Sequence, residues 1–115
     1  MKVINLTPHA INMVDKETKE ILITFPKSQN PARLPTSTVV ISNLEIEGVA
    51  IPITDTAFNY NIATNLPSNQ ESNKFYIVSR LILSAFPERS DLLVPNELVR
   101  DDSGNIIGCA SLAIK

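Results

Sequence analysis

The chain has 115 residues, of which 43% are hydrophobic and 19% charged, and its formal net charge at pH 7 is −2. This composition is typical of a globular protein, and we expect residues 1–115 to form a single domain. A weakly acidic chain is not expected to bind nucleic acid or anionic membranes in general, because both need a basic excess. No apolar run approaches the roughly 20 residues that a helix needs to cross a bilayer.

The cysteine content and the N-terminal sequence indicate a reducing compartment. Cys109 is the single cysteine and cannot form an internal disulfide, and with His9 as the single histidine a structural zinc site is not supplied. Residues 1–8 lack the apolar stretch and cleavage site of a secretory signal. The triplet Asn5-Leu6-Thr7 fits the N-glycosylation pattern, but without an export signal we interpret the match as chance. We expect a cytoplasmic protein that holds no metal and no cofactor.

The first third of the chain predicts a strand followed by a hairpin. Residues 2–6 are β-prone and end before Pro8, because the residue before a proline is pushed toward extended conformations. Residues 10–14 alternate apolar and polar side chains, and a polar turn at 15–19 leads into a second strand segment at 20–25. This pattern predicts the first hairpin.

A proline-rich loop and a second hairpin are predicted next. Residues 26–35 contain three prolines and cannot form a strand interior. Residues 36–46 and 49–53 are rich in β-branched side chains and flank Glu47-Gly48, a dipeptide suited to a tight turn. The stretch that follows, up to the tyrosine at position 60, is ambiguous.

The second half predicts a loop, a buried strand and a short helix. Residues 65–73 are rich in turn formers and predict a surface loop. Residues 74–78 are a continuous apolar and aromatic run, which is typical of a strand in the interior of a sheet. Ser79 suits a helix N-cap, and we expect a helix over 79–86 that ends before Pro87.

A terminal hairpin completes the predicted fold. Residues 92–95 predict a short strand, and residues 98–100 and 105–109 flank the turn sequence Asp101 to Gly104. The predicted fold class is α+β and predominantly β, with one or more antiparallel sheets of hairpins and one short helix packed on one face.

Catalytic and phosphate-binding motifs are absent from the sequence. No nucleophile motif of the type Gly-x-Ser-x-Gly occurs, and the three glycines are too scattered for a phosphate-cradling loop. His9 could act as a base, contact a ligand or serve a structural role in a proline-anchored turn. We expect Asp101-Asp102 to form a turn and Cys109 to be a buried small side chain. The sequence therefore favours a binding protein over an enzyme.

Arginines beside strand ends and turns are the most suggestive polar residues. Ser79 and Arg80 follow the predicted interior strand, and Arg89 and Asp91 flank a serine after the helix. Loops at strand ends are where ligand sites collect, and arginine forms charge-assisted bonds to phosphate. The alternative is that Arg89 and Asp91 form a salt bridge that anchors the turn. The aromatic residues, 5% of the chain, could supply one small pocket.

Several short motifs resemble a family of small phage and prophage proteins that begin with a Leu-Thr-Pro-His signature. These motifs are Asn5 to Ile11, Tyr76 to Ser79, Arg89-Ser90-Asp91 with Pro95 after it, and Asp101 to Cys109. Residues 36–73 carry none of them. The family is largely uncharacterised, so the resemblance implies origin and setting only: a phage-encoded protein acting in the cytoplasm of a bacterial host. Small phage proteins without catalytic motifs often counter host defences by binding an immune protein or a nucleotide signal.

Three hypotheses follow. The first is an oligomeric binding protein that sequesters a small anionic ligand, such as a cyclic or adenine-derived nucleotide signal, and so counters bacterial defence. Its expected ligand-binding residues are His9, Arg33, Tyr76, Ser79, Arg80, Arg89, Asp91 and Arg100, with Tyr60 as a further aromatic contact. The second is a protein-interaction module, either a phage structural or assembly component or an inhibitor of a host protein. The third is a nucleotide hydrolase using Asp91, His9 and a metal.

Overall fold

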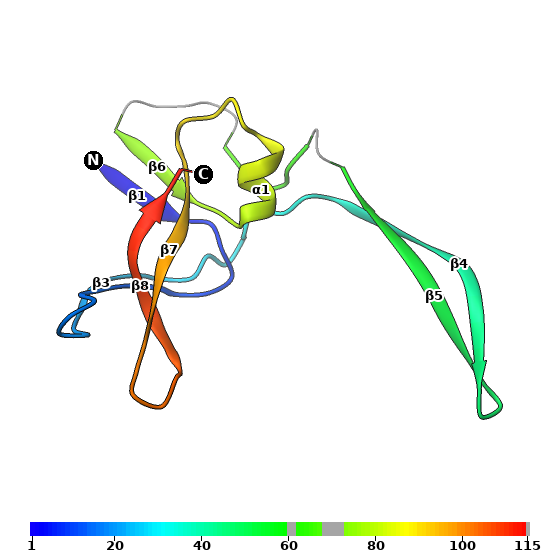
Figure 1. Ribbon diagram of the computed structural model, residues 1–115. Coiled ribbons are helices and arrows are strands. Elements are labelled where there is room, and N and C mark those ends of the chain that lie inside the picture. The colour runs from blue at the N-terminus through cyan, green and yellow to red at the C-terminus, as the bar shows by residue number, and fades with distance from the viewer. Residues whose placement is uncertain (60–61, 68–72, 115) are drawn as a thin grey trace.

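The computed structural model describes residues 1–59, 62–67 and 73–114. Their secondary structure consists of short strands, one long hairpin and one helix (Figure 1). The elements in chain order are β1 (Lys2–Asn5), β2 (Ile11–Val14), β3 (Ile21–Phe25), β4 (Thr36–Ile46), β5 (Val49–Phe58), β6 (Lys74–Ile77), α1 (Arg80–Ala85), β7 (Leu92–Arg100) and β8 (Ile106–Ala113).

A six-stranded sheet carries most of the fold, in the strand order β1-β6-β7-β8-β2-β3. The hairpins β2–β3 and β7–β8 are antiparallel, whereas β6 is parallel to both β1 and β7, and β8 is parallel to β2. The predicted class, mainly β with hairpins and one short helix, is confirmed. The sequence did not predict the parallel pairings, because they join segments that are far apart along the chain and leave no local signal.

Individual elements follow their local sequence closely. The predicted strand at 74–78 is the interior strand β6, and the strands predicted at 92–95 and 98–100 are one continuous strand, β7. The ambiguous stretch after residue 53 extends β5 to Phe58. The predicted surface loop at 65–73 includes residues 68–72, which lie outside the described residues.

Helix α1 begins and ends where its sequence dictates. The Oγ of Ser79 accepts a hydrogen bond from the backbone N–H of Ile82 at 3.3 Å, so Ser79 is the predicted N-cap. The helix gives way at Phe86, directly before Pro87, because the residue before a proline avoids the helical conformation. Its buried face packs on the sheet beside β7.

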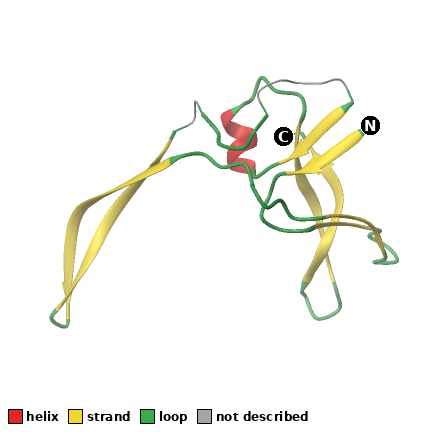
Figure 2. Ribbon diagram, turned by 180° about the vertical axis from the view of Figure 1, so that it is seen from behind, coloured by secondary structure: helices red, strands yellow, loops and turns green. Residues whose placement is uncertain are grey.

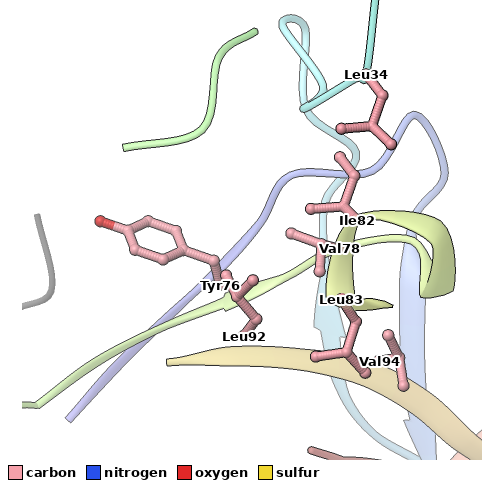
Figure 3. Close-up of a cluster of buried hydrophobic side chains, with 7 residues drawn as sticks. All are labelled: Leu34, Tyr76, Val78, Ile82, Leu83, Leu92 and Val94. Carbon is pink, nitrogen blue, oxygen red and sulfur yellow. The ribbon is translucent and has the colours of Figure 1, made fainter. Parts of the chain in front are cut away.

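The core lies between α1, the strands β6 and β7, and the proline-rich loop (Figure 3). Ile82 and Leu83 of the helix meet side chains from both strands, and Leu34 closes the cluster from the loop. The buried members are Leu34, Tyr76, Val78, Ile82, Leu83, Leu92 and Val94. We call the six-stranded sheet, α1 and their connecting loops the body.

The hairpin β4–β5 stands apart from the body as an arm, residues 36–58. Figures 1 and 2 show it projecting from the side of the molecule that carries α1, with its tip far from every other element. All residues of β4 and β5 are exposed except Ile53, which is half-buried. The radius of gyration is 18.1 Å, whereas a compact chain of this length has about 13 Å. The arm accounts for the difference.

Within the described residues no helix is long and apolar enough to span a membrane.

Candidate functional site

A cleft of about 680 Å³ lies at the base of the arm, where the β1–β2 loop, the segment before β4, the start of α1 and the middle of β7 meet. Four of the residues expected at a ligand site line it, namely His9, Arg33, Ser79 and Arg80. The remaining lining residues are Thr7, Pro8, Ile11, Ala32, Leu34, Thr36, Phe58, Val78, Leu81, Ile82, Val94 and Pro95.

Asn5 fixes the loop that brings His9 to the cleft. Its side chain is buried, and its Nδ2 donates to the backbone oxygens of His9 at 2.7 Å, Pro26 at 3.1 Å and Phe25 at 3.3 Å. Its Oδ1 accepts from the backbone N–H of Thr7 at 2.9 Å and from the Thr7 hydroxyl at 2.7 Å. One side chain therefore ties the β1–β2 loop to the end of β3.

Arg33 reaches the cleft from a backbone that is anchored on both sides. Its N–H donates to the carbonyl of Thr64 at 3.1 Å, and its own carbonyl accepts from the Thr64 N–H at 2.8 Å. The N–H of Ala32, the residue before it, donates to the carbonyl of Leu6 directly after β1 at 2.9 Å, and Leu34 after it enters the core. The Arg33 side chain itself is exposed, so it is directed to the surface at a fixed point.

Ser79 and Arg80 reach the cleft at the junction between β6 and α1. The strand ends at Ile77, Val78 is buried, and the chain then turns into the helix at Arg80. The Ser79 Oγ is engaged as the N-cap acceptor, which leaves its hydroxyl hydrogen for another partner. Arg80 is exposed at the first helical position.

The cleft is electropositive although the chain as a whole is acidic. Its lining includes two arginines and a histidine and no aspartate or glutamate. In the described part of the chain, the side chains of Arg33, Arg80 and His9 have no hydrogen-bond or ion-pair partner. Uncompensated guanidinium groups that share one concave surface attract anions.

Apolar side chains form the floor and one wall of the cleft. Leu34, Val78, Ile82 and Val94 belong to the buried core and close the bottom. Phe58, from the end of β5, exposes 37% of its surface and supplies an aromatic ring at the rim. A cleft with a hydrophobic floor and a few convergent polar groups is the usual form of a small-molecule site.

Arg89 and Asp91 form a buried ion pair outside the cleft lining. The Nε and Nη2 of Arg89 donate to the two carboxylate oxygens of Asp91 at 2.9 and 2.7 Å, and Nη1 donates to the carbonyl of Pro67 at 2.6 Å. The hydrogen bond to Asp91 raises the pKa of the Arg89 guanidinium above its ordinary value. The alternative reading of these two residues, a salt bridge that anchors the turn, is the arrangement observed.

Tyr76 and Arg100 also lie apart from the cleft. Tyr76 is a buried member of the core cluster (Figure 3). Arg100 ends β7 and donates from Nη1 to the carbonyl of Gly104 at 2.8 Å, within the terminal hairpin. The structure thus brings four of the eight expected residues together and places the other four elsewhere. Tyr60 lies outside the described residues.

The remaining polar and thiol groups serve local structure. The Oδ1 of Asp101 accepts from the backbone N–H groups of Ser103 and Asn105, both at 2.9 Å, so Asp101 holds the predicted turn. Cys109 is buried in β8, and burial raises the pKa of its thiol. Among the described residues no group of three or more His, Cys, Asp or Glu side chains could hold a metal ion.

Sequence reasoning missed Asn5, which positions the β1–β2 loop at the cleft. The signal was present, because an asparagine two residues before a threonine is typical of a turn in which the amide oxygen bonds the following backbone. Phe58 is one of the aromatic residues expected to supply a small pocket, but nothing local indicates that it lines the same cleft as Arg33 and Arg80.

Comparisons with protein families, with curated proteins and with solved structures found no match for this chain.

Proposed function

We propose that this protein binds a small anionic ligand of nucleotide type in the cleft and removes it from solution. The observation that carries the proposal is the convergence of Arg33, Arg80 and His9 on one concave surface without an acidic neighbour in its lining. Each guanidinium can make paired, charge-assisted bonds to a phosphate group. Any carboxylate in the lining would oppose such a ligand, and none is present.

The size and polarity of the cleft support a nucleotide more than a lone phosphate. Its volume of about 680 Å³ falls within the range of about 300–1,000 Å³ that small-molecule sites span. The apolar floor and the Phe58 ring offer a surface for a base or ribose, while the arginines at the rim offer contacts for phosphate. The Ser79 hydroxyl and the His9 imidazole add donors that can fix orientation.

The phage resemblance supplies the setting for this proposal. A phage-encoded protein that captures a nucleotide immune signal in the bacterial cytoplasm would counter the defence that makes the signal. Sequestration needs binding alone, which suits a chain whose sequence carries no catalytic motif. The ligand is proposed as a cyclic or adenine-derived nucleotide on the same grounds.

The first test is native mass spectrometry of the protein purified from bacteria that express nucleotide-signalling defence systems. We expect a bound small molecule in stoichiometric amount, released on denaturation and identified by its mass. Arg33→Ala and Arg80→Ala should each abolish retention. Arg100→Ala is the matched control, because Arg100 is an exposed arginine whose hydrogen bond lies in the terminal hairpin.

Calorimetric titration of the wild type and both variants with a panel of cyclic dinucleotides and ADP-ribose derivatives then measures the change in affinity. Loss of one charge-assisted contact is expected to weaken binding by roughly 10-fold to 100-fold. Arg89 is unsuitable for this test, because replacing it would leave Asp91 buried without its partner. A protein that is ligand-free in every background and silent with the whole panel would overturn the proposal.

The second candidate is a protein-interaction module, as a phage assembly component or an inhibitor of a host protein. The exposed arm favours it, since a hairpin with so little burial of its own offers a large contact surface. A ligand-free cleft together with a stoichiometric host or virion protein retained through purification would replace the first candidate with this one.

Hydrolysis of a nucleotide by Asp91, His9 and a metal is the weakest of the three hypotheses. His9 lines the cleft, whereas Asp91 is paired with Arg89 and is not part of the lining. Turnover of the nucleotide panel with a divalent metal, lost in His9→Ala, would support it.

A further inference from the structure

The strongest polar groups of the cleft are hydrogen-bond donors. Arg33 and Arg80 carry guanidinium groups, which donate hydrogen bonds and cannot accept them. The Ser79 Oγ already accepts from the N–H of Ile82 at 3.3 Å, and its hydroxyl hydrogen is left to donate. The fixed polar character of the cleft is therefore that of a donor surface, which suits the oxygens of a phosphate.

The other polar side chains of the lining adapt to their partner or are engaged within the chain. The Thr36 hydroxyl can rotate to donate or to accept, and the His9 imidazole can do either through its two ring nitrogens. The Thr7 hydroxyl donates to the Oδ1 of Asn5 at 2.7 Å. Among the described lining residues there is no carboxylate or amide side chain, the groups that offer a base a fixed acceptor.

Several backbone acceptors at the cleft are engaged in the fold. The carbonyl of Thr7 accepts from the N–H of Ser28 at 2.9 Å, and the carbonyl of Arg33 accepts from the N–H of Thr64 at 2.8 Å. The carbonyl of His9 accepts, at 2.7 Å, from the side-chain amide that fixes the β1–β2 loop. At these three positions the backbone is already bonded and is not free to read the amino group of a base.

The two arginines are expected to bind phosphate in preference to the edge of a base. An ionised phosphate attracts a guanidinium through its charge as well as through paired hydrogen bonds, whereas a base edge is neutral. Arginine can also bind the O6 and N7 atoms of guanine, but only in place of the phosphate. The arginines are therefore occupied by the part of the ligand that all nucleotides share.

The groups that remain for the base are apolar. The floor consists of Leu34, Val78, Ile82 and Val94, whose side chains are gathered in the core cluster in Figure 3. Phe58 adds an aromatic ring at the rim. Stacking on an aromatic ring tolerates any base, because every base has a π face. Such contacts depend on the area of the base and not on its pattern of donors and acceptors.

We propose that the cleft selects its ligand by phosphate charge and accepts any of the common bases. This inference rests on the proposed function and widens its ligand class, from cyclic or adenine-derived nucleotides to nucleotides in general. The signals that the protein removes would then share phosphate and differ in base.

Calorimetric titration with two matched series of nucleotides tests the proposal. The first series is AMP, GMP, CMP and UMP, and the second is cyclic di-AMP and cyclic di-GMP. Within a series the dissociation constants should agree within about 10-fold, with purines favoured by their larger stacking area. Adenosine and guanosine should bind at least about 100-fold more weakly than AMP and GMP, because they lose the charge-assisted bonds to two arginines.

Phe58→Leu tests the contact proposed for the base. The substitution keeps an apolar side chain and removes the ring, so it should weaken every nucleotide by about 5-fold or more and leave inorganic pyrophosphate unchanged. Retained pyrophosphate binding shows that the cleft is intact. Phe75→Leu is the matched control, because Phe75 is a half-buried phenylalanine of β6 outside the lining. Unchanged nucleotide affinity in Phe58→Leu would overturn the stacking contact and with it the basis of base tolerance.

The outcomes separate this inference from the proposed function. One base bound at least about 100-fold more tightly than its matched partners, a difference of about 2.7 kcal/mol, would overturn base tolerance and leave nucleotide capture standing. Nucleosides that bind as tightly as their nucleotides would overturn selection by phosphate. A protein that binds neither series nor pyrophosphate would overturn the proposed function, and this inference with it.

Discussion

The body and the arm are built from the same kind of sequence and reach opposite degrees of burial. β6 and β7 place Tyr76, Ile77, Leu92 and Val94 in the interior, whereas β4 and β5 leave nearly every residue exposed. Both regions are rich in apolar and β-branched residues, and both contain an antiparallel hairpin. The difference teaches that local β pattern selects the strand, while non-local pairing decides whether the strand obtains a core.

The largest expected contrast concerns the buried ion pair of the body. Asp91→Ala should lower the free energy of unfolding by about 3–5 kcal/mol, because it leaves the Arg89 guanidinium buried without its carboxylate. The side chains of Arg89 and Asp91 are only 10% and 6% exposed. Urea denaturation followed by circular dichroism measures the change.

An exposed ion pair provides the control for that prediction. Asp102→Ala removes the partner of Lys19, and the carboxylate is fully exposed, so a change of at most about 1 kcal/mol is expected. Equal effects of the two substitutions would mean that the Arg89–Asp91 pair does not anchor the body.

The next contrast uses one chemical change at two isoleucines. Ile82→Ala in the core should cost about 2–5 kcal/mol, since Ile82 is 1% exposed and its loss leaves a cavity under α1. Ile41→Ala in the arm should cost less than about 0.5 kcal/mol, because Ile41 is 63% exposed and lies at the irregularity of β4. Urea denaturation of both variants measures the two changes. Equal shifts of the two midpoints would contradict the difference in burial between the body and the arm.

A smaller effect is expected when the arm is removed from the body. The backbone N–H of Asn59 donates to the carbonyl of Pro35 at 2.8 Å, so the two ends of the arm are adjacent. Replacing residues 38–56 with a short Gly-Ser linker should change the unfolding free energy of the body by less than about 1 kcal/mol, because loop-closure entropy varies slowly with length. A thermal melt with cooperative unfolding is expected, and an unfolded product would contradict the division into body and arm.

The smallest contrast is the pH response of the turns. Backbone hydrogen bonds, from Asn105 to Asp101 and from Thr18 to Asp15, hold the pKa of each carboxylate below its ordinary value of 3.8. A depressed carboxylate pKa adds stability above the unfolded pKa, and that stability is lost as the pH falls through the folded pKa. The protection factors of the amides in these body turns, which correct for the intrinsic exchange rate, should therefore fall below about pH 4.

The arm turn should not share that acid response. It is formed by positive φ at Glu47 and Gly48, a backbone conformation that does not depend on a carboxylate. Amide exchange measured by NMR at Ser103 and at Gly48 between pH 5 and pH 2 compares the two turns. Asp101→Asn should remove the pH dependence at Ser103, and an unchanged profile in that variant would contradict the role given to Asp101.

The sequence by itself determined the local structure of this protein. Turn residues at Glu47-Gly48 and at Asp101 to Gly104 specified two hairpins, and Ser79 and Pro87 bounded the helix. Such signals act within a few residues through backbone conformation and side-chain hydrogen bonds, so they can be read without knowing the fold.

Only the tertiary structure decided the strand order, the isolation of the arm and the composition of the cleft. Arg33 and Arg80 line the same cleft because Arg33 pairs with Thr64 and because β6 lies between β1 and β7. These pairings join distant segments and have no local signature. From the sequence, Arg89 was as plausible a ligand-binding residue as Arg80. In the structure its guanidinium is instead bound by both carboxylate oxygens of Asp91. Long-range pairing sets which side chains share a surface, and short-range pattern cannot encode that choice.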